Sequence, residues 1–231
     1  MNSIPSNVSV QGIAKRVLSE ITTMISAESS ERTIAATASR LLFRYGVVRT
    51  WYYDCPALVL LGSRSCLSIS GRDYQPSDEL VGQTNLVTID LSPMIGKSCG
   101  DCARSFVIER GRVMSIPSLP EFQHGVTTLR ELHESMLQFV TPETRFSELF
   151  HFTNDWIGAA GYENLDFLNN VGHSIASSLD DRLFVDETTK LPLGSVDCFT
   201  FEPHIRRGGG RWGFKHEDIY YFNQAGQPTV L

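Results

Sequence analysis

An acidic side chain lies inside one of the most apolar segments of the chain, and this placement restricts the folds that the sequence can adopt. Asp90 stands between Ile89 and Leu91 in LVTIDL, residues 86–91. A carboxylate in such a strand is costly to bury unless it is paired with a cation or binds a metal. Asp101 follows 11 residues later, where the next apolar segment, SFVIE (105–109), begins. In a hairpin of these two segments both carboxylates can point toward one place.

Three further side chains of types that bind metals have similar surroundings. His173 follows a glycine in VGHSIA, Glu202 ends the apolar segment CFTFE, and Glu217 opens a strand in GFKHEDIYYF. Taken singly, each has an ordinary structural explanation, such as a turn carboxylate or a core histidine. As a set, four carboxylates and one imidazole are rich in hard oxygen ligands. Such a set suits Mn, Fe, Co or Zn in a two-metal site better than it suits a thiolate zinc site.

Apolar periodicity predicts helices and strands in an order that occurs twice. The expected helices cover residues 13–25, 34–45, 129–139 and 146–160, and the expected strands cover 48–53, 57–61, 86–91, 105–109, 198–202 and 218–222. Each half therefore has two helices followed by strands, and a shift of 115 residues places Gly161 on Gly46. This order predicts an α+β fold of two pseudo-symmetric halves in one domain, with a site where their sheets meet.

Composition excludes several other classes of protein. The 231 residues carry 20 Lys+Arg against 26 Asp+Glu, a net charge of −6, so binding of nucleic acid through phosphate neutralisation is not expected. No stretch approaches the roughly 18 apolar residues of a membrane span, and the N-terminus lacks the apolar core of a signal peptide. The five scattered cysteines fit a reducing compartment, so a cytoplasmic location is expected.

The order and flanks of the five candidate ligands resemble those of the M24 metallopeptidases, the family of methionine aminopeptidase, aminopeptidase P, prolidase and creatinase. The chain has I-D and G-D 11 residues apart at Asp90 and Asp101, G-H-S-I at His173, F-E-P at Glu202 and H-E-D at Glu217. This resemblance covers nearly the whole chain. It implies the pita-bread fold, in which a curved antiparallel sheet is covered by helices.

The resemblance also implies a role for each ligand. Asp101 and Glu217 would bridge two divalent transition-metal ions, such as manganese. Asp90 would complete one metal site, and His173 with Glu202 would complete the other. A hydroxide between the ions would be the nucleophile, and Glu202 would accept the proton of the water that forms it.

Two positions depart from the family pattern. Family peptidases carry further histidines about 18 residues before the first aspartate and about seven after the metal histidine, where this chain has Arg72 and Asp180. Both positions are expected to face the substrate, and Arg72 could bind a carboxylate or phosphate there, or be a solvated loop residue. His204, two residues after Glu202, could supply the missing imidazole or lie in a loop. Lys215 could be a cationic substrate contact or a surface lysine.

These features predict a metallohydrolase that cleaves an amide, peptide or related C–N bond in a small molecule or short peptide. An aminopeptidase of altered specificity is the first hypothesis, because both accessory histidines are absent. A lyase or small-metabolite hydrolase on the same site is the second, and a pseudo-peptidase binding module is the third. No additional N-terminal domain like that of creatinase or prolidase is expected within residues 1–231, and a homodimer is left open.

Overall fold

The computed structural model describes residues 7–176 and 178–231. The helices in these ranges are α1 (Val8–Ile21), α2 (Glu31–Arg44), α3 (Pro120–Phe139) and α4 (Phe146–Ala159). The strands are β1 (Arg49–Thr50), β2 (Ala57–Leu61), β3 (Thr84–Leu91), β4 (Pro93–Ile95), β5 (Ser98–Cys99), β6 (Cys102–Glu109), β7 (Arg112–Met114), β8 (Tyr162–Asn164), β9 (Phe199–Phe201), β10 (His204–Arg207), β11 (Gly213–Phe222) and β12 (Pro228–Val230). Three short 3-10 helices, η1 (Gly62–Cys66), η2 (Leu179–Asp181) and η3 (Leu193–Ser195), lie in the connections.

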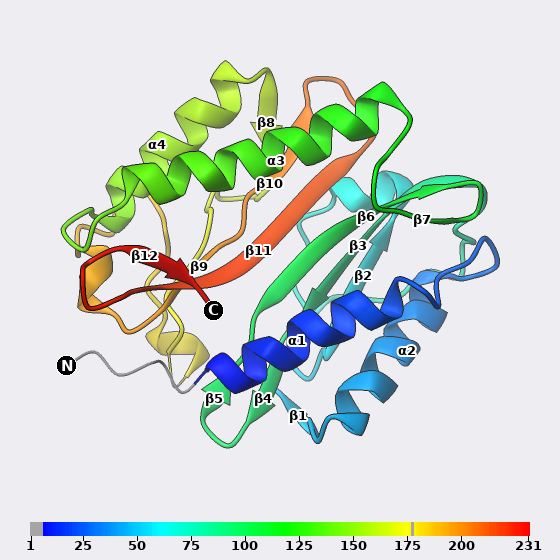
Figure 1. Cartoon of the computed structure of the whole chain (residues 1–231), viewed down its shortest axis with the longest axis horizontal. Coiled ribbons are helices and arrows are strands. Elements are labelled where there is room, and N and C mark those ends of the chain that lie inside the picture. The colour runs from blue at the N-terminus through cyan, green and yellow to red at the C-terminus, as the bar shows by residue number, and fades with distance from the viewer. Residues whose placement is uncertain (1–6, 177) are drawn as a thin grey trace.

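One antiparallel sheet joins the two halves of the chain. Its strand order is β2-β3-β6-β11-β10-β8, with β7 paired to β6, and with β9 and β12 paired to β11. The long strands β6 and β11 run side by side through the centre of the molecule (Figure 1). Helices α1 and α2 lie beside the first-half strands, and α3 and α4 lie beside the second-half strands. The predicted α+β architecture of two helix–helix–strand halves is confirmed.

Each half has its own apolar core. In the first half, α1 and α2 pack against β2 and β3 through fully buried side chains such as Val17, Leu42 and Ile89. In the second half, α3 and α4 bury side chains such as Leu132 and Leu149 against the later strands. Burial of one such side chain contributes roughly 1.5–3 kcal/mol. The second core also includes Leu86 of β3 and Val107 of β6, so apolar packing joins the halves together with the β6–β11 pairing.

The helices begin and end where local chemistry requires. Ser30 caps α2 in a capping box with Thr33, each side chain accepting a hydrogen bond from the other residue's backbone N–H. Gly46 and Gly161 follow α2 and α4 with φ of +81° and +77°, which glycine adopts at little cost. In the part of the chain that the structure describes, no helix is both long and apolar enough to span a membrane.

Several boundaries differ from the sequence-based predictions. The strand predicted at 48–53 was wrong for most of its length, since β1 covers only two residues and the chain turns through positive φ at Tyr53 and Asp54. Helix α3 begins at Pro120, well before residue 129. The prediction missed its first turns because they bury few large apolar side chains and so show little periodicity. Gly125 occupies one of these turns, where any side chain would collide with the ring of Phe214.

The face of β11 that points toward α1 and α3 carries a buried polar network. Asp218 forms one ion pair with Arg104 at 2.7 Å and another with Lys15 on α1 at 3.1 Å. Tyr220 OH lies 2.8 Å from Nδ1 of His133 on α3. Because buried polar groups are costly when unpaired, these contacts fix β11 against both halves. The opposite face of β11, which carries Lys215 and Glu217, is therefore held in place.

Candidate metal centre

Strand register brings the candidate ligands onto one face of the sheet. Asp90 on β3 pairs with Ala103 on β6, and Ala103 pairs with Glu217 on β11. Residues opposite each other in antiparallel strands point to the same face. Asp101 and Lys215 each stand two residues before a member of this row, so alternation gives them the same face. Residues from three strands thus converge although they are far apart in sequence.

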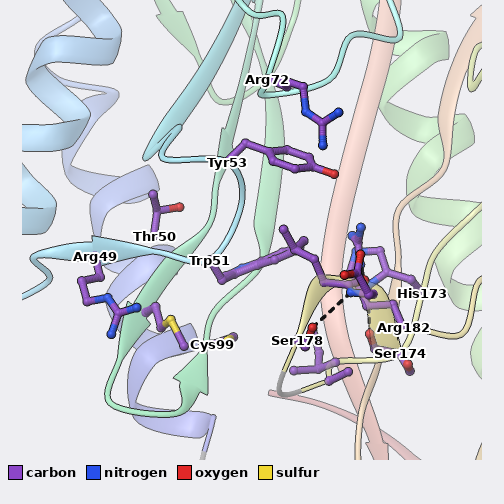
Figure 2. A pocket seen from close by; sticks show the side chains of 15 residues that line it. Arg49, Thr50, Trp51, Tyr53, Arg72, Cys99, His173, Ser174, Ser178 and Arg182 are labelled. Carbon is purple, nitrogen blue, oxygen red and sulfur yellow. Dashed lines mark hydrogen bonds between the residues drawn. The ribbon is translucent and has the colours of Figure 1, made fainter.

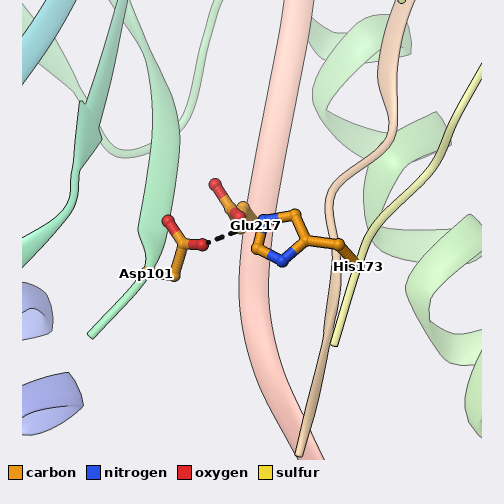
Figure 3. A group of neighbouring side chains, drawn as sticks. All are labelled: Asp101, His173 and Glu217. Carbon is orange, nitrogen blue, oxygen red and sulfur yellow. Dashed lines mark ion pairs between the residues drawn. The ribbon is translucent and has the colours of Figure 1, made fainter. Parts of the chain in front are cut away.

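Asp101, His173 and Glu217 form a compact buried cluster. One ligand atom from each lies within 4.8 Å of the others, and all three residues are buried. Figure 3 shows Asp101 and Glu217 facing the ring of His173, whose Nε2 is 3.3 Å from Asp101 Oδ2. The other ring nitrogen, Nδ1, lies 3.0 Å from the carbonyl oxygen of Ser174. This carbonyl favours the proton on Nδ1, which leaves Nε2 free to bind a metal.

The carboxylates of this cluster have hydrogen-bonding capacity that the protein leaves unused. Within the described residues, Asp101 Oδ2 and both oxygens of Glu217 are inaccessible to solvent and accept no hydrogen bond. Glu217 is only 1% exposed. An unsatisfied buried acceptor costs about 1–3 kcal/mol, and a charged one costs more. A divalent cation would satisfy all three oxygens, and two carboxylates with one imidazole suit a transition metal. The residues therefore fit one such ion.

The pKa values of the cluster reflect its burial. Desolvation raises the pKa of Asp101 to about 6. Desolvation also raises the pKa of Glu217 well above its ordinary value, and the negative charges of Asp101 and Glu202 add to this rise. For His173, burial alone would lower the pKa, but the contact with Asp101 and the charge of Glu202 outweigh it and raise the pKa. Burial is thus the largest cause of the raised pKa values of Asp101 and Glu217, and their carboxylate neighbours add to it.

The other two predicted ligands, Asp90 and Glu202, lie beside the cluster and share a lysine. Lys215 Nζ is 2.7 Å from Asp90 Oδ2, 3.1 Å from Glu202 Oε2 and 3.5 Å from Glu217 Oε2. Glu202 also reaches the cluster, since its Oε1 is 3.6 Å from His173 Nε2. All five predicted ligands and Lys215 line one cavity of about 650 Å³. The structure thus brings the five together.

Comparison with known proteins agrees with this geometry. The model of Metallopeptidase family M24 matches residues 9–224. The chain belongs to this family. No curated protein matches the sequence.

Solved structures show the same pita-bread fold as this M24 chain. An X-Pro aminopeptidase from Thermotoga maritima aligns with a TM-score of 0.78 and 20% identity, over 95% of this chain and 58% of its own. The prolidase from Pyrococcus furiosus aligns with a TM-score of 0.79 and 18% identity, over 99% of this chain and 64% of its own. A methionine aminopeptidase from Rickettsia prowazekii aligns with a TM-score of 0.73 and 12% identity, over 94% of this chain and 92% of its own. The chain thus spans less than two thirds of the first two proteins.

His204, the predicted replacement for the missing M24 histidines, lines the same cavity as the five ligands. It is buried on β10, where the register places it opposite Lys215. Its Nε2 lies 2.6 Å from the carbonyl oxygen of Ser65 and donates to it. Burial, together with the charge of Lys215, lowers the pKa of His204 to about 4. The imidazole is therefore neutral near pH 7, with Nδ1 as its remaining hydrogen-bonding atom.

Arg72 and Asp180 line a neighbouring cavity of about 520 Å³ and not the one that holds the five ligands. In Figure 2, Arg72 lies against the ring of Tyr53, with its guanidinium carbon 4.6 Å from the ring centroid. The two cavities share a wall that includes Trp51 and His173. Both residues thus stand beside the metal centre and not in it.

Two residues of this shared wall were not predicted as site residues. Trp51 approaches His173 edge to face, with 5.6 Å between ring centroids, and its Nε1 donates to Gly100. The guanidinium of Arg182 lies 5.3 Å from the centroid of the Trp51 ring. The aromatic run at 51–53 is a signal that could have pointed to Trp51, but no local pattern around residue 182 distinguishes Arg182 from a surface arginine.

Gly172 sets the position of His173. A Cβ at residue 172 would lie 2.1 Å from the carbonyl oxygen of Thr200, much closer than real carbon and oxygen atoms approach. Thr200 also binds the next residue directly, since its Oγ1 accepts from His173 N at 3.0 Å and its N donates to His173 O at 2.7 Å. A side chain at residue 172 must therefore move His173 away from the cluster.

We expect Gly172→Ala to destabilise the protein by about 1–3 kcal/mol, the range for overpacked sites, and to weaken metal binding by about 10–100-fold. Thermal unfolding and equilibrium dialysis against Mn²⁺ measure the two effects. Gly158→Ala is the matched control, because Gly158 lies in α4 with open space around its Cβ position. Unchanged metal affinity in Gly172→Ala would contradict the role given to this glycine.

Proposed function

We propose that this chain is a metal-dependent hydrolase that cleaves an amide, peptide or related C–N bond in a small substrate. The observation that carries the proposal is the buried cluster of Asp101, His173 and Glu217, in which three carboxylate oxygens accept no hydrogen bond, beside a cavity of about 650 Å³ in an M24 fold. The names of the similar structures, which include an X-Pro aminopeptidase and several prolidases, support a peptide-like substrate.

Asp101, His173 and Glu217 would hold the ion, with Glu202 beside them. When bound, a divalent cation would polarise a substrate carbonyl and lower the pKa of water. Manganese, iron, cobalt and zinc all accept this donor set. The number of ions depends on Lys215, which contacts three of the five expected ligands.

Glu202 is the best-placed proton acceptor. Its side chain is 22% exposed toward the cavity, the most open of the carboxylates that contact His173. Burial alone would raise the pKa of Glu202, but the charges of Lys215 and His173 outweigh it and lower the pKa. Glu202 is therefore ionised near neutral pH and able to take a proton from water, then pass it to the leaving nitrogen.

Arginines favour a substrate that carries an anionic group. Arg49, Arg72 and Arg182 all line the cavity of about 520 Å³ beside the metal centre. Among the described residues, none of the three forms an ion pair with a carboxylate of the protein, although the chain as a whole is acidic. Arginine side chains bind carboxylates and phosphates in two-pronged fashion. We therefore place the anionic end of the substrate here and the scissile bond over the cluster.

The proposed function is tested by metal binding and by cleavage of a peptide panel. We expect purified protein to bind Mn²⁺, and Asp101→Asn to lose more than about 100-fold in affinity, because removal of a direct ligand costs more than the roughly 10–100-fold typical of an outer-shell partner. Glu187→Gln, an exposed carboxylate at the rim of the same cavity, is the matched control for metal content. The panel contains short peptides with free amino termini, including Xaa-Pro and Met-first sequences.

The outcomes separate the three hypotheses. Metal binding with cleavage of panel peptides supports an aminopeptidase. Metal binding without any cleavage removes the aminopeptidase hypothesis and leaves a lyase or small-metabolite hydrolase. Absence of metal binding after growth and dialysis in supplemented medium contradicts a metal-dependent enzyme and favours a binding module.

His204 is proposed as a second proton-accepting group, a neutral imidazole that would act through Nδ1 because its Nε2 already donates to Ser65. We expect His204→Gln to lower kcat by roughly 10²–10⁴-fold, the range typical of such groups, with the metal content unchanged. His151→Gln, an exposed histidine on α4, is the control. The measurement is steady-state turnover with metal analysis of the same samples, and unaltered kcat would eliminate this role.

Arg72 is proposed to bind the anionic group of the substrate. We expect Arg72→Gln to raise KM about tenfold for a peptide acid, as for loss of a hydrogen bond to a charged group, and to leave KM for the matching peptide amide nearly unchanged. Arg110→Gln, an exposed arginine in the β6–β7 turn, is the control. Equal effects on the acid and the amide would show that Arg72 does not recognise the charge.

A further inference from the structure

The ammonium group of Lys215 lies inside the carboxylate cluster, where a cation would bind. Its three contacts, of 2.7, 3.1 and 3.5 Å, reach Asp90, Glu202 and Glu217. The Lys215 side chain is 17% exposed, so bulk water screens these contacts only partly. Lys215 thus supplies a fixed positive charge to the side of the site that contains Asp90.

The position of this ammonium follows from the fold and not from a flexible side chain alone. Lys215 pairs with His204 across the β10–β11 ladder, and its backbone N donates to Ser105 Oγ at 2.8 Å. Strand alternation then points Lys215 and Glu217 to the same face. The stem of Lys215 therefore begins inside the cavity, and the nearest groups of opposite charge are the metal-site carboxylates.

The two sides of the site differ in what their carboxylates contact. Asp90 Oδ2 accepts a hydrogen bond from Lys215, and within the described residues no other side chain donates to Asp90. The two oxygens of Glu202 contact different residues: Oε2 lies near Lys215 and Oε1 lies near His173. Asp101 contacts His173 and has no contact with Lys215 within 4 Å. The lysine thus lies on the Asp90 side of the site, and among the described residues no lysine or arginine forms an ion pair with Asp101, whose partner is His173.

We infer that Lys215 takes the place of a second metal ion, so that this site holds one divalent cation on Asp101, His173 and Glu217. A second dication on Asp90 would lie within a few ångströms of the ammonium, and like charges at that distance repel strongly in a partly buried site. Glu202 Oε1 can join the single ion, while Asp90 serves as the partner of Lys215. The inference rests on the proposed function only in that a cation binds to the cluster.

The test is the metal stoichiometry of the full chain after equilibrium dialysis against saturating Mn²⁺, measured by elemental analysis. We expect one equivalent in the unmodified protein and two in Lys215→Met, which keeps the length of the side chain but removes its charge. Lys215→Arg, which keeps the charge, should again bind one. We also expect Asp90→Asn to keep its single ion with unchanged affinity, whereas Asp101→Asn binds its ion more than about 100-fold more weakly.

Each outcome decides a different point. Two equivalents in the unmodified protein overturn the inference, whether or not Lys215→Met folds, and leave the proposed metal-dependent function intact. One equivalent in both the unmodified protein and a folded Lys215→Met variant, checked by circular dichroism, shows that the lysine does not exclude a second ion. No metal in any variant contradicts the proposed function itself and removes the inference with it.

Discussion

Negative charge concentrated on one face of the sheet, from Asp90 on β3, Glu217 on β11 and Asp101 directly before β6, is the constraint on which the site depends. The register of these strands places carboxylates in one row, and burial makes their ionised forms costly. Cations must offset that cost. Lys215 offsets part of it from within the protein, and the carboxylate oxygens of Asp101 and Glu217 that accept no hydrogen bond mark where a metal would offset the rest. The polar network of Asp218 and Tyr220 on the other face of β11 holds in place the strand that carries Lys215 and Glu217.

Much of this arrangement could be predicted from the sequence. Apolar periodicity located each of the four α-helices found in the described residues, although it missed the first turns of α3, because each packs a regular face against the sheet. A strand carboxylate such as Asp90 could be singled out because its neighbours are apolar. The convergence of Asp90 with His173 could not be derived from periodicity, since it depends on pairing between distant strands. That step came from the resemblance of the flanking motifs to the M24 pattern.

Other features could not be predicted because they depend on distances between separate elements. Alternation along the strand allowed Lys215 to face the site, but its contact with carboxylates of other strands is set by tertiary packing. Arg182 has no local pattern that marks it, and its place beside Trp51 depends on how a connecting segment folds back. Short strands such as β1 and β4 are too brief to show a period. Propensity is a weak guide in such segments.

The origin of the ligands has a consequence for how the molecule unfolds. Asp101 comes from the first half of the chain, and His173 and Glu217 come from the second. A bound ion therefore adds a cross-link to the contacts that already join the halves, which include the β6–β11 ladder and the Lys15–Asp218 ion pair. Ligation of the native state alone raises its stability by mass action. The cooperativity of unfolding between the halves should accordingly increase with metal concentration. The ion would therefore stabilise the fold as well as take part in the reaction.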